Sequence, residues 1–296
     1  MKNYNKVLII YNPNAMKGKI DEFLPHIKQR LLLRFAQVDA MYSPMEDGAE
    51  ALAYKNSSNY DIVVVCGGDG TVNQVVNGVV KSGANSVVAI LPFGTSNDLA
   101  KTLNIPLDLD KAIDTILRLN TTEYDLMYDG EQYITSSLAT GYLTSVSYTT
   151  SNKAKKKMGK FAYFLARLKN LFKLKALPIT ITCDSERIHD KFVYFSLINT
   201  VSFNGMNVNK NDDYANGKVK LVLIKKSKFL GSFFVMLRLY LKGLNSIRKN
   251  KIVTIRDVSK IEIENHANSP FTLDGEKSKF LKKMISVSTT VKIIKN

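Results

Sequence analysis

The stretch Ile62-Val63-Val64-Val65-Cys66-Gly67-Gly68-Asp69-Gly70-Thr71 decides the fold of the first half of this 296-residue chain. Its apolar, mostly β-branched run predicts a strand that is buried on both faces. A glycine-rich turn follows at once, and after it apolar residues recur at helical spacing. A strand, a tight turn and a helix in direct succession form the unit from which parallel α/β sheets are built.

The same alternation extends over the first 120 residues. This strand is expected to span Tyr60 to Cys66, and further strands are expected at Lys6 to Tyr11, Gln37 to Tyr42 and Ser86 to Leu91. Helical patterns lie between and after them, at Ile20 to Arg34, Glu46 to Lys55, Val72 to Val80 and Leu109 to Leu119. This order predicts a doubly wound α/β domain over residues 1–125, with helices on both faces of a parallel sheet.

After Thr121 the pattern changes to short alternating runs separated by turn signals. They predict a mainly antiparallel, sandwich-like β domain over residues 126–296. Its expected strands are 123–128, 132–138, 179–183, 192–199, 218–225, 252–255, 260–264, 271–273 and 285–294. Two helical patterns interrupt them, at Phe161 to Lys175 and Leu230 to Ile247, and the last run can return to the first domain.

Charge and composition narrow the classes of partner and compartment. The 42 Lys and Arg residues exceed the 26 Asp and Glu residues, so the net charge of +16 should attract a nucleotide, a nucleic acid or an acidic membrane surface. No nucleic-acid module is recognisable, and we expect no nucleic-acid partner.

The longest apolar segment, Phe229 to Leu244, is broken by Arg238 and Lys242. Cys66 and Cys183 lack metal-ligand spacing, and a cytoplasmic protein with two reduced thiols is expected.

The turn Gly67 to Thr71 has the features of an anion site. Glycines let the backbone approach a ligand, and N–H groups at a helix N-terminus point towards a bound phosphate. Thr71 is suited to cap the helix, and the Asp69 carboxylate beside phosphates makes sense with a cation or a transferring proton nearby. The alternative is an ordinary glycine turn with a threonine cap.

Two other loops resemble this one in position. Pro92-Phe93-Gly94-Thr95-Ser96-Asn97-Asp98 follows the next strand, with Thr95 and Asp98 spaced as a capping box. Thr95 could contact a nucleotide, or the polar residues could serve the helix cap alone. Asn12-Pro13-Asn14-Ala15 follows the first strand. All three loops therefore lie at carboxyl ends of parallel strands, where such sheets bind ligands. Neither a P-loop nor a complete G-x-G-x-x-G fingerprint is present.

Four motifs together resemble the diacylglycerol kinase catalytic-domain family, in particular its soluble bacterial members, which are similar to sphingosine kinases. They occur in the family's order and span most of the chain: Tyr11-Asn12-Pro13, Gly67-Gly68-Asp69-Gly70-Thr71-Val72-Asn73, Pro92-Phe93-Gly94-Thr95-Ser96-Asn97-Asp98-Leu99-Ala100 and Asp274-Gly275-Glu276. The resemblance implies a lipid kinase that moves the γ-phosphoryl group of ATP to the hydroxyl of diacylglycerol or a similar lipid, giving phosphatidic acid.

The resemblance also implies roles for individual residues. Asp274 would be the catalytic base, Asp69 would act beside the phosphates and Mg²⁺, and Glu276 would lie near the nucleotide. ATP would be held by Asn12, Pro13, Asn14, Ala15, Met16, Ser43, Gly67, Gly68, Asp69, Gly70, Thr71, Val72, Asn73 and Thr95. Phosphoryl transfer needs such a carboxylate to orient and deprotonate the acceptor hydroxyl. Without the resemblance, Asp274-Gly275 would be read as a hairpin turn.

Several positions depart from the family pattern. Ala15-Met16 replaces a Ser-Gly pair, and Gln74 replaces a Glu, which removes a charge. A structural Mg²⁺ would be held by Asp213, Asn216 and Lys218, with Asn216 where relatives carry Asp. An Asn oxygen can still ligate magnesium, more weakly. Asp125 and Lys17 could join a charge network, or could be isolated charges.

A basic segment, Lys153 to Lys160, precedes the helical pattern at Phe161 to Lys175. An amphipathic helix of this kind suits an anionic bilayer, which would make the protein peripheral at the inner membrane surface. In the alternative its apolar face packs on the β domain, and Leu230 to Ile247 leaves the same two alternatives. The sequence leaves open whether the chain forms a homodimer.

Two rival functions follow from the same motifs. An NAD or sugar kinase would share the Gly-Gly-Asp-Gly turn, although Pro92 to Asp98 has the lipid-kinase form. A nucleotide- or lipid-binding protein without turnover would explain Met16, Gln74 and Asn216, although Asp69, Asp274 and Glu276 are retained.

Overall fold

The computed structural model describes residues 4–13, 18–43, 48–141, 175–203, 206–207, 214–227 and 230–296. Asn14, Ala15, Met16, Lys17 and Asp213 lie outside these residues, as do the basic segment Lys153 to Lys160 and nearly all of the expected helix at Phe161 to Lys175. The chain divides into two compact units. Unit 1 comprises Met1–Leu126, Asp213–Asn216 and Thr289–Asn296, and unit 2 comprises Met127–Asp212 and Gly217–Ser288.

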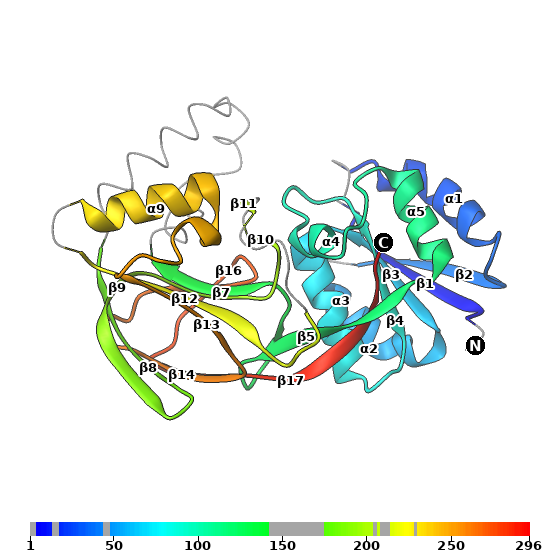
Figure 1. The fold of residues 1–296 in the computed structure, drawn as a ribbon. Helices are drawn as coiled ribbons and strands as arrows, with labels where there is room; N and C mark the ends of the chain where they lie inside the picture. Colours follow the sequence, from blue (N-terminus) through cyan, green and yellow to red (C-terminus); the bar gives the residue numbers. More distant parts are fainter. Residues whose placement is uncertain are drawn as a thin grey trace. The chain divides into compact units, whose positions relative to one another are not determined.

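Unit 1 contains a parallel sheet in the order β4-β3-β1-β2 (Figure 1). Its strands are β1 (Lys6–Tyr11), β2 (Gln37–Tyr42), β3 (Ile62–Gly67) and β4 (Val87–Pro92). The central strand β3 pairs with β1 from Val7↔Ile62 and with β4 from Ile62↔Val87. Every residue of β3 and β4 is buried, which explains their continuous apolar sequences.

Helices cover both faces of this sheet. They are α1 (Ile20–Leu31), α2 (Gly48–Asn56), α3 (Asp69–Lys81), α4 (Asp98–Thr102) and α5 (Leu109–Arg118), with a 3-10 turn at Ser57–Asn59. Figure 1 shows α2 and α3 together on one side and α1 and α5 on the other. The predicted doubly wound domain is confirmed. Its strand limits agree within two residues. Helix α3 begins three residues earlier than expected, and α4 was expected only as a cap at Thr95 to Asp98, not as a helical pattern.

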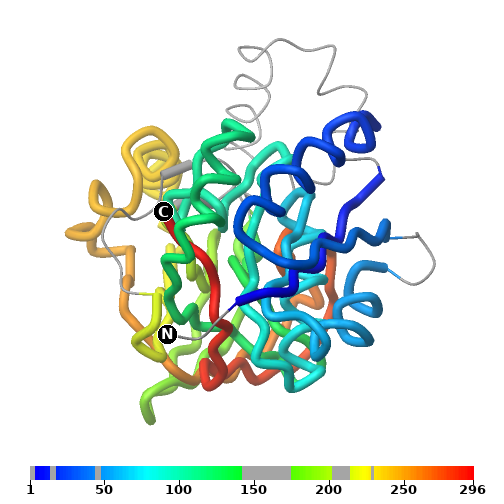
Figure 2. Tube along the Cα trace, turned by 90° about the vertical axis from the view of Figure 1, so that its right-hand side faces the viewer, coloured from blue at the N-terminus to red at the C-terminus, as the bar shows by residue number. Residues whose placement is uncertain are grey.

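The C-terminus lies in unit 1. The last residues of β17 (Lys282–Ile294) run parallel to β4, with Ile293 opposite Val88. The backbone N–H groups of Lys295 and Asn296 then donate to the carbonyls of Asn120 and Leu103. The red end of the trace in Figure 2 shows this terminal segment beside the green residues that surround it.

Unit 2 is a mainly antiparallel β structure in two layers. The strands are β6 (Tyr133–Ile134), β7 (Ser137–Gly141), β8 (Leu177–Cys183), β9 (Glu186–Ile198), β10 (Ser202–Phe203), β11 (Met206–Asn207), β12 (Val219–Lys225), β13 (Val253–Val258), β14 (Lys260–Asn265), β15 (Phe271–Leu273) and β16 (Glu276–Ser278). They are joined by the end of β5 (Thr121–Tyr128) and the start of β17. The first half of β9 pairs with β8 and its second half with β7 and β12, so this strand belongs to both layers.

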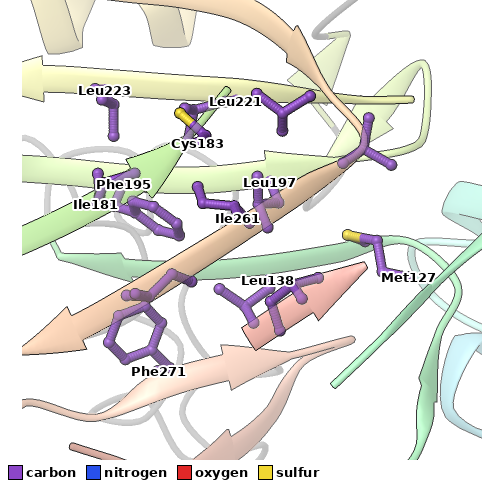
Figure 3. Close-up of a cluster of buried hydrophobic side chains, with 14 of the residues drawn as sticks. Met127, Leu138, Ile181, Cys183, Phe195, Leu197, Leu221, Leu223, Ile261 and Phe271 are labelled. Carbon is purple, nitrogen blue, oxygen red and sulfur yellow. The ribbon is translucent and has the colours of Figure 1, made fainter. Parts of the chain in front are cut away.

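Alternation along the strands builds two cores in unit 2. Leu197 and Leu221 point into a cluster between the layers, together with Leu138, Ile181, Ile261 and Phe271 (Figure 3). Ile198 and Val222 point to the opposite face, where they pack under α9 (Gly231–Lys242) and the following turn at Leu244–Ser246. Both cysteines are buried and free. The predicted antiparallel, sandwich-like architecture is confirmed.

None of the helices in the described part of the chain is long and apolar enough to span a membrane.

Candidate active site

The glycine turn between β3 and α3 is the centre of the candidate site in unit 1. Gly67 ends β3, Gly68 is the N-cap of α3 in an extended conformation, and Asp69 is the first helical residue. No side chain among the described residues caps this helix end. Thr71, which was expected to be the cap, instead lies inside the first turn and is largely buried. The first N–H groups of α3 have no intrahelical partners and are available to an anion.

Close packing explains the missing side chain at Gly67, Gly68 and Gly94 but not at Gly70. A Cβ on Gly68 would lie 3.1 Å from the Gly94 Cα. A Cβ on Gly67 would lie 2.6 Å from the Thr71 Cβ, and a Cβ on Gly94 would lie 2.5 Å from the Gly68 Cα. The two glycine loops can therefore touch only because Gly68 and Gly94 lack side chains, whereas Gly67 leaves room for Thr71. A Cβ on Gly70 would meet no protein atom within 4 Å, and its φ is not positive. The fold leaves open space at Gly70, at the helix N-terminus where a phosphate would approach.

Asp69 joins the first glycine loop to the second. Its Oδ2 accepts a hydrogen bond from the Asn97 N–H at 2.8 Å, and its Oδ1 accepts one from the Asp98 N–H at 2.6 Å. The carboxylate thus caps α4 from outside. The expected Thr95–Asp98 capping box is wrong, because α4 begins at Asp98 and Asn97 is its N-cap, with φ of 50°.

Two hydrogen bonds within the second glycine loop, after β4, join Gly94 to Asn97. The Gly94 N–H donates to the Asn97 Oδ1 at 2.9 Å, and the Asn97 side-chain amide donates back to the Gly94 carbonyl at 3.0 Å. The Phe93 N–H continues the pairing of β4 with β3 by donating to the Gly67 carbonyl. Thr95 is left exposed beside this loop, where its hydroxyl can reach a ligand.

The loop after β1, which begins at Asn12, lies against the glycine turn between β3 and α3. The Asn12 side-chain amide donates to the Thr71 hydroxyl at 3.5 Å, and the Asn12 N–H donates to the Cys66 carbonyl. Pro13 follows directly in the turn. Ser43, after β2, is largely buried and donates its N–H and hydroxyl to the Tyr11 carbonyl. Asn12 and the two glycine loops are therefore brought together, while Ser43 is tied to the end of β1.

Two predicted contacts in α3 have side chains turned towards the protein. Val72 is 3% exposed and belongs to the buried face of the helix, so it could meet a ligand only through its backbone. The Asn73 Oδ1 accepts from the Asn77 side-chain amide at 3.0 Å. Gln74 has a structural contact that the sequence did not reveal: its Oε1 accepts from the Ala49 N–H at 3.1 Å at the start of α2.

Asp274 lies in unit 2, in the two-residue turn between β15 and β16. Leu273 pairs with Glu276, and Asp274 and Gly275 have φ of 47° and 92°. Positive φ at both positions is the geometry of a type I′ turn. The carboxylate accepts four hydrogen bonds, from the Thr135, Ser136 and Ser137 N–H groups and the Thr135 hydroxyl, at 2.6 to 2.8 Å.

Thr135, Ser136 and Ser137 form a cradle of donors around the Asp274 carboxylate. The surroundings of this carboxylate act on its pKa in two opposing ways. Burial raises the pKa of the Asp274 carboxyl above its ordinary value of 3.8, and the hydrogen bonds from Thr135, Ser136 and Ser137 oppose that rise. A raised pKa makes a carboxylate a stronger base. These four donors, all from residues that the structure describes, also occupy lone-pair positions of the carboxylate. A substrate hydroxyl could therefore bind Asp274 only by replacing one of them.

The remaining predicted residues are less constrained. Glu276 is exposed at the start of β16. Asn216 and Lys218 are also exposed. Near them, the buried Asp125 donates its N–H to the Tyr214 carbonyl at 2.7 Å within unit 1. Among the described residues there is no group of three His, Cys, Asp or Glu side chains placed to hold a metal ion.

Sequence reasoning missed the residues that hold the two carboxylates. Thr135, Ser136 and Ser137 were assigned only to a strand, although three consecutive small polar residues after Ile134 are a signal for a backbone cradle. The Asn97 and Asp98 backbone N–H groups left no signal of their own, because any residue at these positions presents an N–H.

Comparison with known proteins identifies the family that this chain matches. The family model "Diacylglycerol kinase catalytic domain" matches residues 6–128. A protein named diacylglycerol kinase from Staphylococcus haemolyticus is 30% identical over 271 residues, which cover 90% of this chain and 81% of that protein. Its namesake from Staphylococcus saprophyticus is 29% identical, with 90% and 88% covered.

Solved structures share the fold. The crystal structure of a diacylglycerol kinase from Bacillus anthracis covers the whole chain and 98% of its own, with a TM-score of 0.79 and 21% identity. An NAD kinase from Archaeoglobus fulgidus, solved with ATP, has a TM-score of 0.53 and 13% identity, covering 98% and 94% of the two chains. At these identities the structures establish architecture alone.

Proposed function

Because this chain belongs to the diacylglycerol kinase family, we propose that it transfers the γ-phosphoryl group of ATP to the hydroxyl of diacylglycerol, giving phosphatidic acid. Membership of this family identifies the chain as a lipid kinase. The observation that carries the proposal from this chain's own residues is the junction of the two glycine loops. Asp69 holds the second loop against the uncapped N-terminus of α3.

The phosphates of ATP fit this junction by charge and by space. N–H groups of the first turn of α3 would donate to phosphate oxygens, and the helix dipole adds positive potential there. The open position at Gly70 allows an oxygen to approach the backbone closely. Asn12 and Thr95 border the same region, and Asn14, Ala15 and Met16 are proposed to complete it.

Asp274 is proposed as the base. As the hydroxyl oxygen of the lipid forms its bond to the γ-phosphorus, the bond from that phosphorus to the β,γ-bridging oxygen breaks and ADP leaves. The hydroxyl proton passes to a carboxylate oxygen of Asp274. The Thr135 hydroxyl is the donor that can yield its place, because a hydroxyl rotates whereas the N–H groups of Ser136 and Ser137 are fixed in the backbone.

Mg²⁺ fits the proposal as the companion of ATP. When bound, it neutralises charge on the β- and γ-phosphates, and it usually keeps several waters and takes one or two carboxylates from the protein. Asp69 is the carboxylate nearest to the proposed phosphate site along the chain, and each of its oxygens retains acceptor capacity beyond the one hydrogen bond to the second loop. A second ion at Asp213, Asn216 and Lys218 is also proposed.

The substrate determines the remaining partner. Diacylglycerol stays in a bilayer, so its kinase must visit an acidic membrane surface as a peripheral protein, which we propose to be the inner surface of the cell membrane. The net charge of +16 is consistent with attraction to such a surface.

A lipid panel tests the proposal. Purified protein would be supplied with ATP, Mg²⁺ and mixed micelles that contain diacylglycerol, monoacylglycerol or sphingosine, and the products identified by mass spectrometry. We expect phosphatidic acid to form fastest. Faster phosphorylation of sphingosine, or no phosphorylated lipid at all, would reject diacylglycerol as the substrate.

A further inference from the structure

Helix α9 of unit 2 has one buried and one exposed apolar face. Phe233, Met236 and Leu239 pack into the core formed with β9 and β12. That packing confirms one of the two alternatives for Leu230 to Ile247, but it uses only one side of the helix. The residues at Leu230, Phe234 and Leu241 point the other way and are 50%, 59% and 59% exposed.

These exposed side chains form a stripe along one face of the helix, interrupted by Arg238. Their spacings of four and seven residues place them within one face of an α-helix, and Arg238 lies between Phe234 and Leu241 on the same face. Large exposed apolar groups in a row, within a helix already anchored by its other face, indicate a surface that has a partner.

Cations occur on the same helix and in the turn after it. From Tyr214 to Arg256 the sequence contains 11 Lys and Arg residues and not one Asp or Glu. Three of them, on β12 and β13, pair with acidic residues elsewhere: Lys220 with Asp257, Lys225 with Asp190 and Arg256 with Glu186. The cations on α9 and in the turn after it form no ion pair with any residue that the structure describes: Arg238, Lys242, Arg248, Lys249 and Lys251.

A groove lies between α9 and the turn that follows it. It has a volume of about 640 Å³ and is lined by Phe234 and Arg238 from α9 and by Ile247, Arg248 and Lys249 from the following turn. Each wall thus combines an apolar side chain with cationic ones. This combination matches the boundary of a bilayer, where acyl chains meet charged headgroups.

We infer that the exposed face of α9, with the turn at residues 245–251, docks the protein on an anionic phospholipid bilayer. Leu230, Phe234 and Leu241 enter the acyl boundary, and Arg238, Arg248 and Lys249 contact headgroup phosphates. A partner of neutral charge would leave these cations without counter-charges. The inference rests on the proposed function in that a lipid kinase must reach a substrate held in a membrane, but bilayer binding can be measured without turnover.

The chain contains no tryptophan, so a single introduced one reports on this surface alone. Phe234→Trp protein would be mixed with phosphatidylglycerol vesicles in the absence of ATP and diacylglycerol. We expect its emission to shift to the blue and to be quenched by brominated acyl chains, with no such change on phosphatidylcholine. Leu33→Trp, at a 73% exposed position on unit 1, is the matched control and should not be quenched.

Charge removal provides the second arm of the test. Changing Arg238, Arg248 and Lys249 to Gln should weaken binding to phosphatidylglycerol vesicles by roughly 100-fold at low ionic strength. Changing three cations elsewhere, Lys55, Lys111 and Lys260, to Gln removes the same charge and should weaken binding far less. Equal losses in the two triple variants, or an unquenched tryptophan in the Phe234→Trp protein, would overturn the inference. Loss of docking with turnover retained in detergent micelles would leave the lipid kinase proposal intact.

Discussion

Asp69 and Asp274 are both carboxylates next to a glycine, and both are held by backbone N–H groups, yet they are held in different ways. Asp69 accepts one hydrogen bond on each oxygen and links two loops of unit 1. Asp274 accepts two on each oxygen from one short segment of unit 2, and burial raises its pKa. The difference suggests that Asp69 builds the phosphate site and that Asp274 takes the proton.

Replacing Asp274 by Asn should have the largest effect. An amide cannot take up a proton from the substrate hydroxyl, so kcat should fall by about 10²- to 10⁴-fold. The dissociation constant for ATP, measured by calorimetry, should change little because Asp274 belongs to the proton-transfer step in this account. A variant that keeps its turnover would remove Asp274 as the base.

The amide also disturbs the cradle, since its NH₂ group would face N–H donors. Thermal unfolding of Asp274→Asn and of a second variant, Asp274→Ser, separates the two effects. If both variants remain folded at the assay temperature, the loss of turnover belongs to the chemistry rather than to the fold.

The Asp69→Asn change should act more on nucleotide binding than on turnover. One of the two N–H groups at Asn97 and Asp98 would lose its acceptor, which costs about 1 to 3 kcal/mol of folding stability and loosens the second loop. We expect KM for ATP to rise by roughly tenfold, as a loss of about 1.4 kcal/mol in binding would give. A collapse of kcat with unchanged KM would instead make Asp69 the base and reverse the comparison.

Thr135→Val removes the hydroxyl that donates to Asp274. The hydroxyl stabilises the charged carboxylate, so its loss should raise the pKa of Asp274 further. The base works only when ionised, so kcat/KM falls as the pH drops through the pKa of Asp274. This acid limb should lie above pH 3.8 in the unmodified protein and move to higher pH in Thr135→Val.

Thr135→Ser keeps the hydroxyl and is the matched control, with an unchanged acid limb. The same shift predicts a stability effect of opposite direction. A carboxyl with a raised pKa binds its proton more tightly in the folded chain, so ionisation of Asp274 lowers the free energy of unfolding as the pH rises from 3.8 through the raised pKa. If the acid limb does not move in Thr135→Val, the hydrogen bond from Thr135 does not control the ionisation of the catalytic base.

Gly70→Ala should have the smallest effect. It should raise the stability of the fold and lower the affinity for ATP. The new methyl group meets no protein atom, so the helix should gain up to about 1 kcal/mol of stability from the better helix former. ATP affinity should fall several-fold because the methyl group occupies the space kept for phosphate. Gly67→Ala, which would place a Cβ 2.6 Å from that of Thr71, should lose stability and serves as the contrast.

Much of the architecture followed from local sequence. Short β-branched runs such as Ile62 to Cys66, bounded by glycine, indicate buried strands, and their alternation with helical patterns predicts the parallel sheet. The first half of β9, Glu186 to Lys191, was missed because its polar, exposed residues lack an apolar pattern. The five-residue helix α4 is too short to show a helical period.

The candidate site was predictable only in part. Glycine-rich loops mark a phosphate site because few other roles require such residues together. What Asp69 and Asp274 contact depends on chain segments 28 or more residues away. Those contacts go to backbone N–H groups, which every residue except proline carries, so sequence cannot reveal them.

One competition experiment tests the central claim most directly. The protein would receive ATP labelled at the γ-phosphate, with Mg²⁺, diacylglycerol micelles and NAD in the same tube, and the label would be followed into the lipid and aqueous phases. The account predicts label in phosphatidic acid and none in NADP. Label in NADP with an unlabelled lipid phase would contradict it.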